Sequence, residues 1–307
     1  MANSFGADTT AEEAAGDVDL SGKTIVLTGG SAGLGVEAAR VLAKRGARVV
    51  SVVRDRAKGE AAAGRIRETV PNADIEFAEL DLFDLDSVRK GADDIAARFP
   101  KIDRLINNAG VMMCPLGRTK EGLDTQLGTN HLGHFVLTAR LIDSLSAATP
   151  ARIVNLSSGG HRLSPLRFED PFFERDEYNK FTAYGQAKTA NVLFSVALDK
   201  RFKGRGIRSY AVHPGAIQTE LSRHMDRDDI KTLMSSRPQN EPMNFKTLEA
   251  GAATTVWAAT SAELDGQGGV YCEDCNVADV IDEPGASFGV VSWAVDDEAA
   301  EKLWTLS

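Results

Sequence analysis

Short apolar runs rich in β-branched residues alternate with longer amphipathic stretches along most of the chain. The apolar runs predict strands, because several are apolar at nearly every position, as expected for strands covered on both faces. They lie at 24–28, 48–53, 75–80, 104–106, 152–156, 207–212 and 269–271. Helical patterns lie between them at 35–45, 57–70, 85–98, 122–145, 182–202 and 245–259. This alternation is typical of βαβ units in a parallel sheet.

The predicted strands and crossovers account for the chain without a linker, an internal repeat or a shift in composition. The pattern therefore predicts one doubly wound α/β domain over residues 21–307, with about seven parallel strands flanked by helices. Residues 1–20, 159–181 and 221–243 fall outside the alternation. In the N-terminal extension 1–20, Thr10-Ala-Glu-Glu13 fits a capping box. A short packed helix and a disordered tail are equal alternatives there.

Composition and charge limit the partners. Hydrophobic residues make up 43% and charged residues 26% of the chain, which is ordinary globular usage, and no apolar run approaches the roughly 18 residues of a membrane span. The net charge of −9 disfavours nucleic acids and anionic membrane surfaces. The N-terminus lacks the pattern of a secretory signal, and three cysteines are too few for a disulfide framework. A cytoplasmic location is expected.

No metal site is expected. Cys272-Glu-Asp-Cys275 has metal or redox spacing, but no second cysteine pair or downstream histidine follows to complete a set of ligands. His131 and His134 lie on one predicted helix without an acidic or cysteine partner at ligand spacing. Structural roles are therefore expected for both histidines.

A glycine-rich turn joins the first strand to the next helix. It reads Thr28-Gly-Gly-Ser-Ala-Gly-Leu-Gly35. Glycines permit a tight turn and a close backbone approach, so that amides and the helix N-terminus can face a pyrophosphate. The spacing Gly-x-x-x-Gly-x-Gly differs from the commoner Gly-x-Gly-x-x-Gly. The turn predicts a dinucleotide site of another subtype.

The end of the second strand indicates which dinucleotide is preferred, because the adenosine ribose lies there. The sequence is Val53-Arg54-Asp55, and Lys58 follows one helical turn later. The guanidinium of Arg54 suits a 2′-phosphate, and Lys58 adds positive charge. NADP(H) is therefore favoured, with NAD(H) as the alternative. In that alternative Arg54 pairs with a carboxylate and Asp55 binds the ribose.

Tyr184 and Lys188 lie four residues apart on a predicted helix, and so on one face. An ammonium and a cationic nicotinamide would lower the pKa of a tyrosine below its ordinary value of about 10 and allow proton transfer to a carbonyl oxygen. Other polar segments follow strands at the same sheet edge, where ligands of doubly wound folds bind. They include Ser157 and Ser158 after the fifth strand, and Asn108 after the fourth.

Taken together, these segments resemble the short-chain dehydrogenase/reductase family from about Leu20 onward. The resemblance implies a Rossmann domain and a catalytic set of Asn130, Ser158, Tyr184 and Lys188. Tyr184 would donate or accept the proton, and Ser158, the second serine of its pair, would orient the substrate oxygen. Lys188 would bind the ribose hydroxyls and lower the pKa of Tyr184. Asn130 would anchor a water relay behind Lys188.

The resemblance also implies a set of cofactor contacts. Asp81 resembles the adenine contact, and Asn108 resembles the residue beside the adenosine-side ribose. Asn130-His-Leu-Gly-His134, the segment from Arg54 to Glu60 and the Trp304 region resemble the retinol-dehydrogenase-like subgroup, which supports NADP(H). The complete set of expected cofactor residues is Gly29, Ser31, Gly33, Leu34, Gly35, Arg54, Lys58, Asp81, Leu82, Asn108, Ala109, Gly110, Tyr184, Lys188, Pro214, Gly215, Ile217 and Thr219.

The predicted function is hydride transfer between NADP(H) and a carbonyl or alcohol, which is ketone or aldehyde reduction or the reverse. The partner is a small or medium, largely apolar molecule, contacted by Ser158, Tyr184 and His161, and a homo-oligomer is compatible with the pattern. The loop 221–243 and the insertion that contains His161, Leu163 and Phe168 are expected to line the pocket. A non-catalytic NADP(H)-sensing regulator is disfavoured by the complete Asn, Ser, Tyr and Lys set. An NAD(P)-dependent epimerase or dehydratase is disfavoured because no substrate domain follows the sheet.

Overall fold

The structure is a computed structural model that describes residues 5–235 and 244–307. Within these ranges one sheet has the strand order β3-β2-β1-β4-β5-β6-β7-β8. Its strands from β1 to β7 are parallel, and β8 pairs antiparallel with β7. They span Thr24–Thr28 (β1), Arg48–Val53 (β2), Ile75–Glu79 (β3), Arg104–Asn107 (β4), Ala151–Leu156 (β5), Ile207–His213 (β6), Val270–Glu273 (β7) and Asn276–Val277 (β8). This order is that of a doubly wound Rossmann sheet, as predicted.

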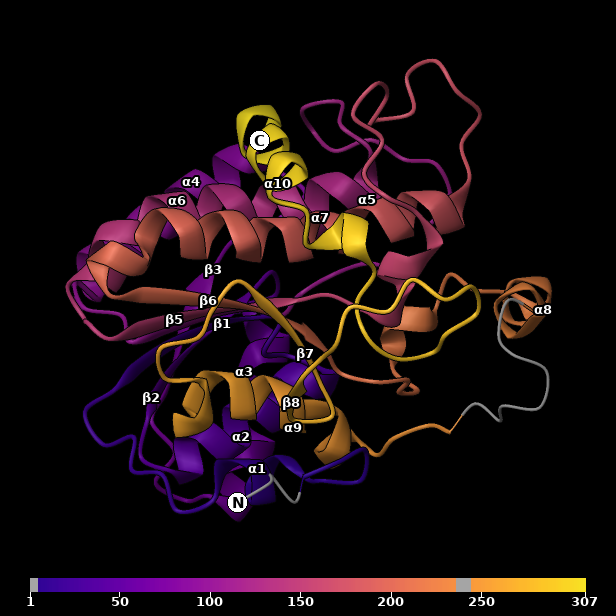
Figure 1. The fold of residues 1–307 in the computed structure, drawn as a ribbon. Coiled ribbons are helices and arrows are strands. Elements are labelled where there is room, and N and C mark those ends of the chain that lie inside the picture. The colour runs from indigo at the N-terminus through magenta and orange to yellow at the C-terminus, as the bar shows by residue number, and fades with distance from the viewer. Residues whose placement is uncertain (1–4, 236–243) are drawn as a thin grey trace.

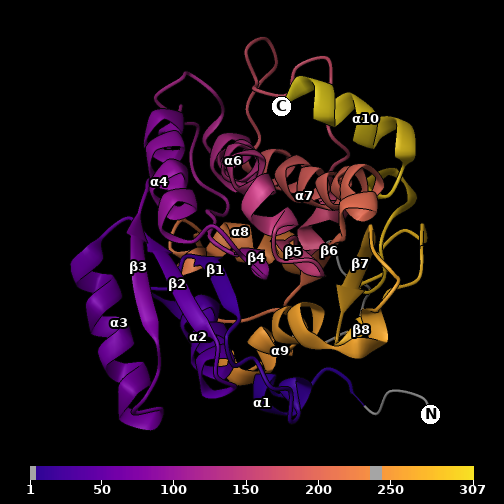
Figure 2. The ribbon, with the colours of Figure 1, turned by 90° about the vertical axis from the view of Figure 1, so that its left-hand side faces the viewer.

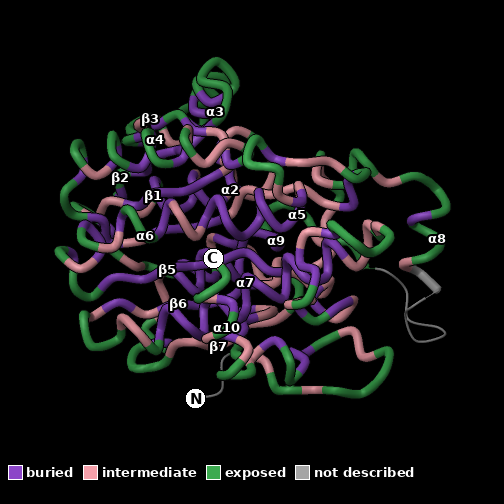
Figure 3. Tube along the Cα trace, turned by 90° about the horizontal axis from the view of Figure 1, so that it is seen from above, coloured by how far each residue is buried: buried purple, intermediate pink, exposed green. Residues whose placement is uncertain are grey.

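Helices cover both faces of the sheet (Figure 1). One layer contains α4 (Leu85–Arg98), α6 (Gly133–Ser146), α7 (Lys180–Phe202) and α10 (Asp297–Leu306). The other contains α1 (Ala11–Ala15), α2 (Gly33–Lys44), α3 (Arg56–Thr69) and α9 (Leu248–Thr260). Figure 2 shows the sheet between these layers, and Figure 3 shows the buried trace running through the middle of the molecule. The single α/β domain is confirmed.

The eighth strand was not predicted. Glu273 of β7 pairs with Asn276 of β8, and the two residues between them, Asp274 and Cys275, have φ angles of 48° and 57°. Two left-handed residues are what a tight two-residue hairpin requires. The sequence carries no glycine or asparagine at these two positions, so the usual hairpin signal is missing. The Cys272/Cys275 pair thus belongs to a hairpin, and both cysteines are buried and outside any disulfide.

The segment 122–145 was predicted as one helix but contains a break. A short helix, α5 (Thr125–Leu127), is capped by Asp124 and leads into a π-helical turn at Gly128–Leu132, after which α6 begins. Two further helices were not predicted, namely α8 (Arg227–Ser235) and α10. Single-turn π segments are frequent at functional sites, and this one contains Asn130.

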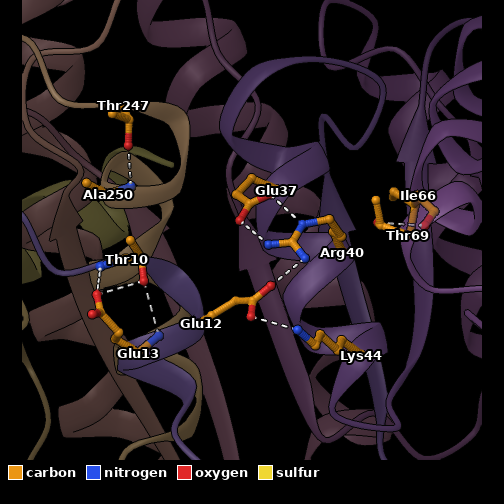
Figure 4. A network of polar contacts seen from close by, with 10 residues as sticks. All are labelled: Thr10, Glu12, Glu13, Glu37, Arg40, Lys44, Ile66, Thr69, Thr247 and Ala250. Carbon is orange, nitrogen blue, oxygen red and sulfur yellow. Dashed lines mark hydrogen bonds and ion pairs between the residues drawn. The ribbon is translucent and has the colours of Figure 1, made fainter.

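The N-terminal extension contains a packed helix, which settles the alternatives for the part from residue 5 onward (Figure 4). The capping box is formed, with Thr10 and Glu13 each accepting from the other's backbone amide. Glu12 bridges to α2 through Arg40 at 2.6 Å and Lys44 at 2.7 Å. The alanines of α1 are buried in the core beside α2 and α9. Residues 1–4 lie outside the described part.

Within the described ranges, no helix combines the length and the apolar character needed to cross a membrane.

Candidate active site

A cavity of about 1430 Å³ opens at the carboxyl ends of the parallel strands. Its wall is made by the segments that leave β1 to β7 and by loops from the C-terminal part of the chain. Pockets for one small molecule usually measure about 300 to 1000 Å³. The cavity therefore has room for a dinucleotide together with a substrate.

The glycine turn forms one wall of this cavity. Helix α2 begins at Gly33, and its N-cap residue Ala32 has no side chain that could accept from the first amides. Gly33 has a φ of 56°, in the left-handed region that glycine favours. A Cβ on Gly35 would lie 2.3 Å from the carbonyl oxygen of Gly29. The turn thus presents uncapped amides at a helix N-terminus, which fits the pyrophosphate of a dinucleotide.

Nearly all the expected cofactor residues lie on the cavity wall. The exception is Lys58, which does not line the cavity. Those that line it are Gly29, Ser31, Gly33, Leu34, Gly35, Arg54, Asp81, Leu82, Asn108, Ala109, Gly110, Tyr184, Lys188, Pro214, Gly215, Ile217 and Thr219. The topology therefore brings the predicted segments of five strand ends and of helix α7 together at one edge of the sheet.

Arg54 and Asp55 occupy different places. Arg54 is exposed on the cavity wall, and no described residue makes an ion pair or hydrogen bond with its guanidinium. Asp55 is the N-cap of α3, where its carboxylate accepts from the amide of Lys58 at 3.2 Å, and it does not line the cavity. The cation at the end of β2 is therefore available to a ligand, while the neighbouring carboxylate is committed to a helix cap.

Tyr184 and Lys188 lie in the first turns of α7, against the end of β5. The Ser158 hydroxyl lies near the Tyr184 side chain and acts to lower its pKa. A Cβ on Gly160 would lie 2.6 Å from Tyr184 Cε1 and 3.4 Å from Ser158 Oγ. The Nζ of Lys188 donates to the carbonyl oxygen of Leu156 at 3.0 Å and lies 5.6 Å from the centre of the Tyr184 ring. Ser157 instead points to α7 and donates to the carbonyl oxygen of Lys188 at 2.9 Å. Of the two serines, Ser158 is the one beside the tyrosine hydroxyl.

Burial determines the protonation of Tyr184 and Lys188 in the chain without cofactor. Burial raises the pKa of Tyr184 to about 12, although the neighbouring Ser158 hydroxyl acts in the opposite direction. Burial lowers the pKa of Lys188 to about 8. In the chain without cofactor, desolvation of the phenolate dominates the Tyr184 pKa. The expected lowering of this pKa by Lys188 together with a cationic nicotinamide stays a prediction. At neutral pH Tyr184 is protonated and Lys188 is charged.

Asn130 is buried behind the cavity wall, on the π-helical turn before α6. Its Oδ1 accepts from the amide of Val111 at 2.8 Å, and its Nδ2 donates to the carbonyl oxygen of Val111 at 2.9 Å. A Cβ on Gly110 would lie 2.9 Å from Asn130 Oδ1 and 3.8 Å from Lys188 Nζ. Asn130 thus holds the segment after β4 against Lys188.

His161 does not reach the cavity wall, contrary to the expected substrate contact. It is fully buried, and its Nδ1 donates to the carbonyl oxygen of Ser158 at 2.7 Å. Its Nε2 accepts from the amide of Val291 at 3.2 Å. The imidazole therefore ties the turn after Ser158 to a C-terminal loop. Phe168 also lies away from the cavity, partly buried against the apolar core.

The substrate end of the cavity was only partly predicted. Leu163 and the described part of the loop 221–243 line it, whereas residues 236–243 lie outside the described part. The segment 282–288 and Trp293 also line it, and the sequence offered neither periodicity nor a motif there. The apolar side chains at this end are Leu163, Leu221, Met225, Ile230, Leu233, Phe245, Phe288 and Trp293.

His213 is another wall residue that sequence reasoning did not assign. Its Nδ1 accepts from the amides of Gly159 at 3.2 Å and Gly215 at 3.3 Å. The proton of the neutral ring must therefore be on Nε2. The signal that could have identified His213 as a wall residue is its position in the sequence directly before Pro214-Gly215.

Comparison with known proteins agrees with this geometry. Residues 23–230 match the short chain dehydrogenase family. Retinol dehydrogenase 12 of Homo sapiens is 40% identical over 291 residues, which are 95% of this chain and 87% of that protein. The short-chain dehydrogenase/reductase prx1 of Penicillium rubens is 38% identical over 293 residues, covering 94% and 84%.

Solved structures show the same fold. A crystal structure of an uncharacterized protein from Mycobacterium paratuberculosis has a TM-score of 0.73 and 34% identity, covering 95% of this chain and 94% of that one. The NADP complex of RhlG from Pseudomonas aeruginosa has a TM-score of 0.65 and 24% identity, covering 83% and 95%. The chain belongs to the short chain dehydrogenase family, with retinol dehydrogenases among its relatives, and is an NAD(P)-dependent oxidoreductase acting on alcohol or carbonyl groups.

Proposed function

We propose that this protein is an NADP(H)-preferring carbonyl reductase or alcohol dehydrogenase in which Tyr184 is the general acid and base. The observation that carries the proposal is that Tyr184 and Ser158 lie beside each other on the wall of a cavity that also contains the glycine turn. A hydroxyl pair beside a dinucleotide site can bind a carbonyl oxygen and supply its proton.

When bound, the nicotinamide supplies or accepts the hydride. In the reducing direction Tyr184 donates its proton to the substrate oxygen as the carbon receives the hydride, and Ser158 donates a hydrogen bond that orients this oxygen. The raised pKa of Tyr184, about 12, keeps the hydroxyl protonated before the reaction. Lys188 remains charged below its pKa of about 8 and stabilises the phenolate that forms. The oxidation of an alcohol follows the reverse path.

The preference for NADP(H) is part of the proposal and is supported by Arg54. Its guanidinium lies on the cavity wall where the adenosine ribose of a doubly wound fold is bound, and Asp55 is committed to the cap of α3. A 2′-phosphate would give this cation a charge-assisted partner. Lys58 does not line the cavity, so its charge would attract the 2′-phosphate only from a greater distance.

The substrate end supports a largely apolar carbonyl compound or alcohol, because large apolar side chains, among them Phe245, Phe288 and Trp293, line it beside polar and charged ones. The names of the retinol dehydrogenase relatives agree with an apolar substrate. We also propose a cytoplasmic location, which the three buried cysteines, none of them in a disulfide, support.

The test follows nicotinamide absorbance with a panel of ketones, aldehydes and alcohols for the wild type and Tyr184→Phe. We expect turnover of at least one apolar substrate by the wild type. The variant should lose about 100-fold or more in kcat, because it lacks the proton donor, while its Kd for NADPH stays unchanged. Equal turnover by the two proteins would contradict the assignment of Tyr184.

A further inference from the structure

His134, in the first turn of α6, lies between the glycine turn and Asn130. Its side chain is buried, with 2% of its surface exposed. Its Nδ1 lies 3.0 Å from the carbonyl oxygen of Asn130, and its Nε2 lies 2.9 Å from the hydroxyl of Thr28, the last residue of β1. One imidazole thus contacts the catalytic π-helical turn and the strand that leads into the cofactor turn.

The partners determine the tautomer of this ring. A carbonyl oxygen can only accept, so Nδ1 must carry a proton. Burial lowers the pKa of His134 to about 4, so the ring is neutral near pH 7 and Nε2 has no proton. The Thr28 hydroxyl therefore donates to Nε2. Its oxygen in turn accepts from the amides of Asn108 at 2.9 Å and Ala109 at 3.0 Å.

These bonds form one directed chain that encloses the segment 108–111 of the cavity wall. Thr28 holds the first half of the segment through the amides of Asn108 and Ala109. Asn130 holds its end through the two hydrogen bonds with Val111. The His134 imidazole joins these two holders.

We propose that His134 is a positioning residue, which fixes Asn130 and Thr28 relative to each other and thereby sets the position of the wall segment 108–111 against the cofactor and Lys188. His134 itself does not line the cavity and touches no reacting atom. Its role is to orient the segment 108–111, which does line the cavity. The proposal rests on the proposed function only for its effect on cofactor binding and turnover, since the hydrogen-bond chain is a property of the protein alone.

The first test is the tautomer of His134, measured by nitrogen NMR of the imidazole rings in the ligand-free protein near pH 7. We expect Nδ1 protonated and Nε2 unprotonated for His134. His213 serves as an internal reference, because its Nδ1 accepts from two amides and its proton must be on Nε2. The His134 signals are identified by their loss in His134→Gln. A proton on Nε2 of His134, or on both nitrogens, would overturn the proposal.

The second test compares His134→Leu with His131→Leu, using NADPH fluorescence for Kd, steady-state kinetics and thermal unfolding. His131 is a matched control because it is also buried and only three residues away, but its Nε2 bonds with the hydroxyl of Ser307. We expect His134→Leu to raise the Kd for NADPH by about 10-fold, since a hydrogen-bond chain with a buried hydroxyl is interrupted. His131→Leu should change the melting temperature and leave this Kd unchanged.

His134→Gln separates a lost hydrogen-bond bridge from a damaged core. Its amide can donate to the carbonyl oxygen of Asn130 and accept from Thr28, so we expect it to recover most of the cofactor affinity. Equal shifts of Kd in the two leucine variants, or no recovery by glutamine, would contradict the proposal. If His134→Leu does not fold, the tautomer and the glutamine variant decide it. If the wild type binds no NADPH, the proposed function fails, whereas the tautomer still tests the bridge.

Discussion

At the cofactor end of the cavity the wall is made mainly of the short turns that leave β1 to β3 and the first residues after β4, whereas at the substrate end it is made mainly of long segments that follow β5, β6 and β8. The turns are held by backbone geometry and buried hydrogen bonds, such as that of Asn108 to the carbonyl oxygen of Thr28 at 2.8 Å. The loops present exposed apolar side chains, including Phe245, Phe288 and Trp293. Substitutions at the first end should therefore affect binding of any substrate, and substitutions at the second only the choice among substrates.

The largest effect is expected at Gly35. In Gly35→Ala the new Cβ would lie 2.3 Å from the Gly29 carbonyl oxygen and 2.8 Å from Asn108 Nδ2, two groups fixed by the turn. The turn must shift, and we expect the Kd for NADPH to rise by about 100-fold or more, because the amides that face the pyrophosphate are displaced. Fluorescence titration measures this.

Gly64→Ala is the matched control for that experiment. Gly64 lies inside α3, and a Cβ there would meet no atom within 4 Å. Replacing glycine by alanine within a helix should raise the free energy of unfolding by about 0.5–1 kcal/mol. Its Kd for NADPH should equal that of the wild type. An unchanged Kd for NADPH in Gly35→Ala would show that the turn tolerates displacement. It would contradict the expectation that the cofactor end of the cavity is more sensitive to substitution than the substrate end.

The second-largest effect is expected at Arg54. This residue also lies at the cofactor end, but it would contact the cofactor through its side chain, whereas the glycine turn would do so through its backbone. In Arg54→Ala, kcat/KM with NADPH should fall by about 10- to 100-fold, the size of a lost charge-assisted hydrogen bond. The value with NADH should stay within a factor of about two, because no 2′-phosphate is present to lose a partner. Lys58→Ala, off the cavity wall, is the control and should change the NADPH value much less.

A uniform loss with both cofactors in Arg54→Ala would indicate that the guanidinium supports the fold of the wall and does not recognise a phosphate. A larger loss in Lys58→Ala than in Arg54→Ala would reverse the two assignments. Either result would leave the glycine turn as the one feature that distinguishes the cofactor end of the cavity from the substrate end.

The same contrast explains what the sequence alone could predict. The glycine turn was predictable because a left-handed Gly33 and a close approach at Gly35 admit no other residue. The shared helix face of Tyr184 and Lys188 was predictable from their four-residue spacing. The protonation of that pair was not, since it depends on burial by segments distant in the sequence.

Other features depended on contacts that leave no local pattern. His161 lies in the insertion expected to line the pocket, yet its partner Val291 comes from the far end of the chain and turns the ring into the core. The hairpin of β7 and β8 places Asp274 and Cys275 in left-handed conformations without the usual residues. At the substrate end, loops determine the wall, and their course follows from such distant contacts.

The smallest effect is expected at Phe288. This side chain lines the substrate end of the cavity and is 58% exposed in the chain without ligand, so its removal costs little in stability. In Phe288→Ala, kcat/KM for an apolar substrate should fall about three- to tenfold, since part of the apolar surface that would cover the substrate is lost. The Kd for NADPH should not change.

Leu306→Ala, which removes an exposed apolar side chain on α10 away from the cavity, is the control and should leave both values unchanged. A higher Kd for NADPH in Phe288→Ala would mean that the loop also closes over the cofactor, so that the two ends of the cavity act as one.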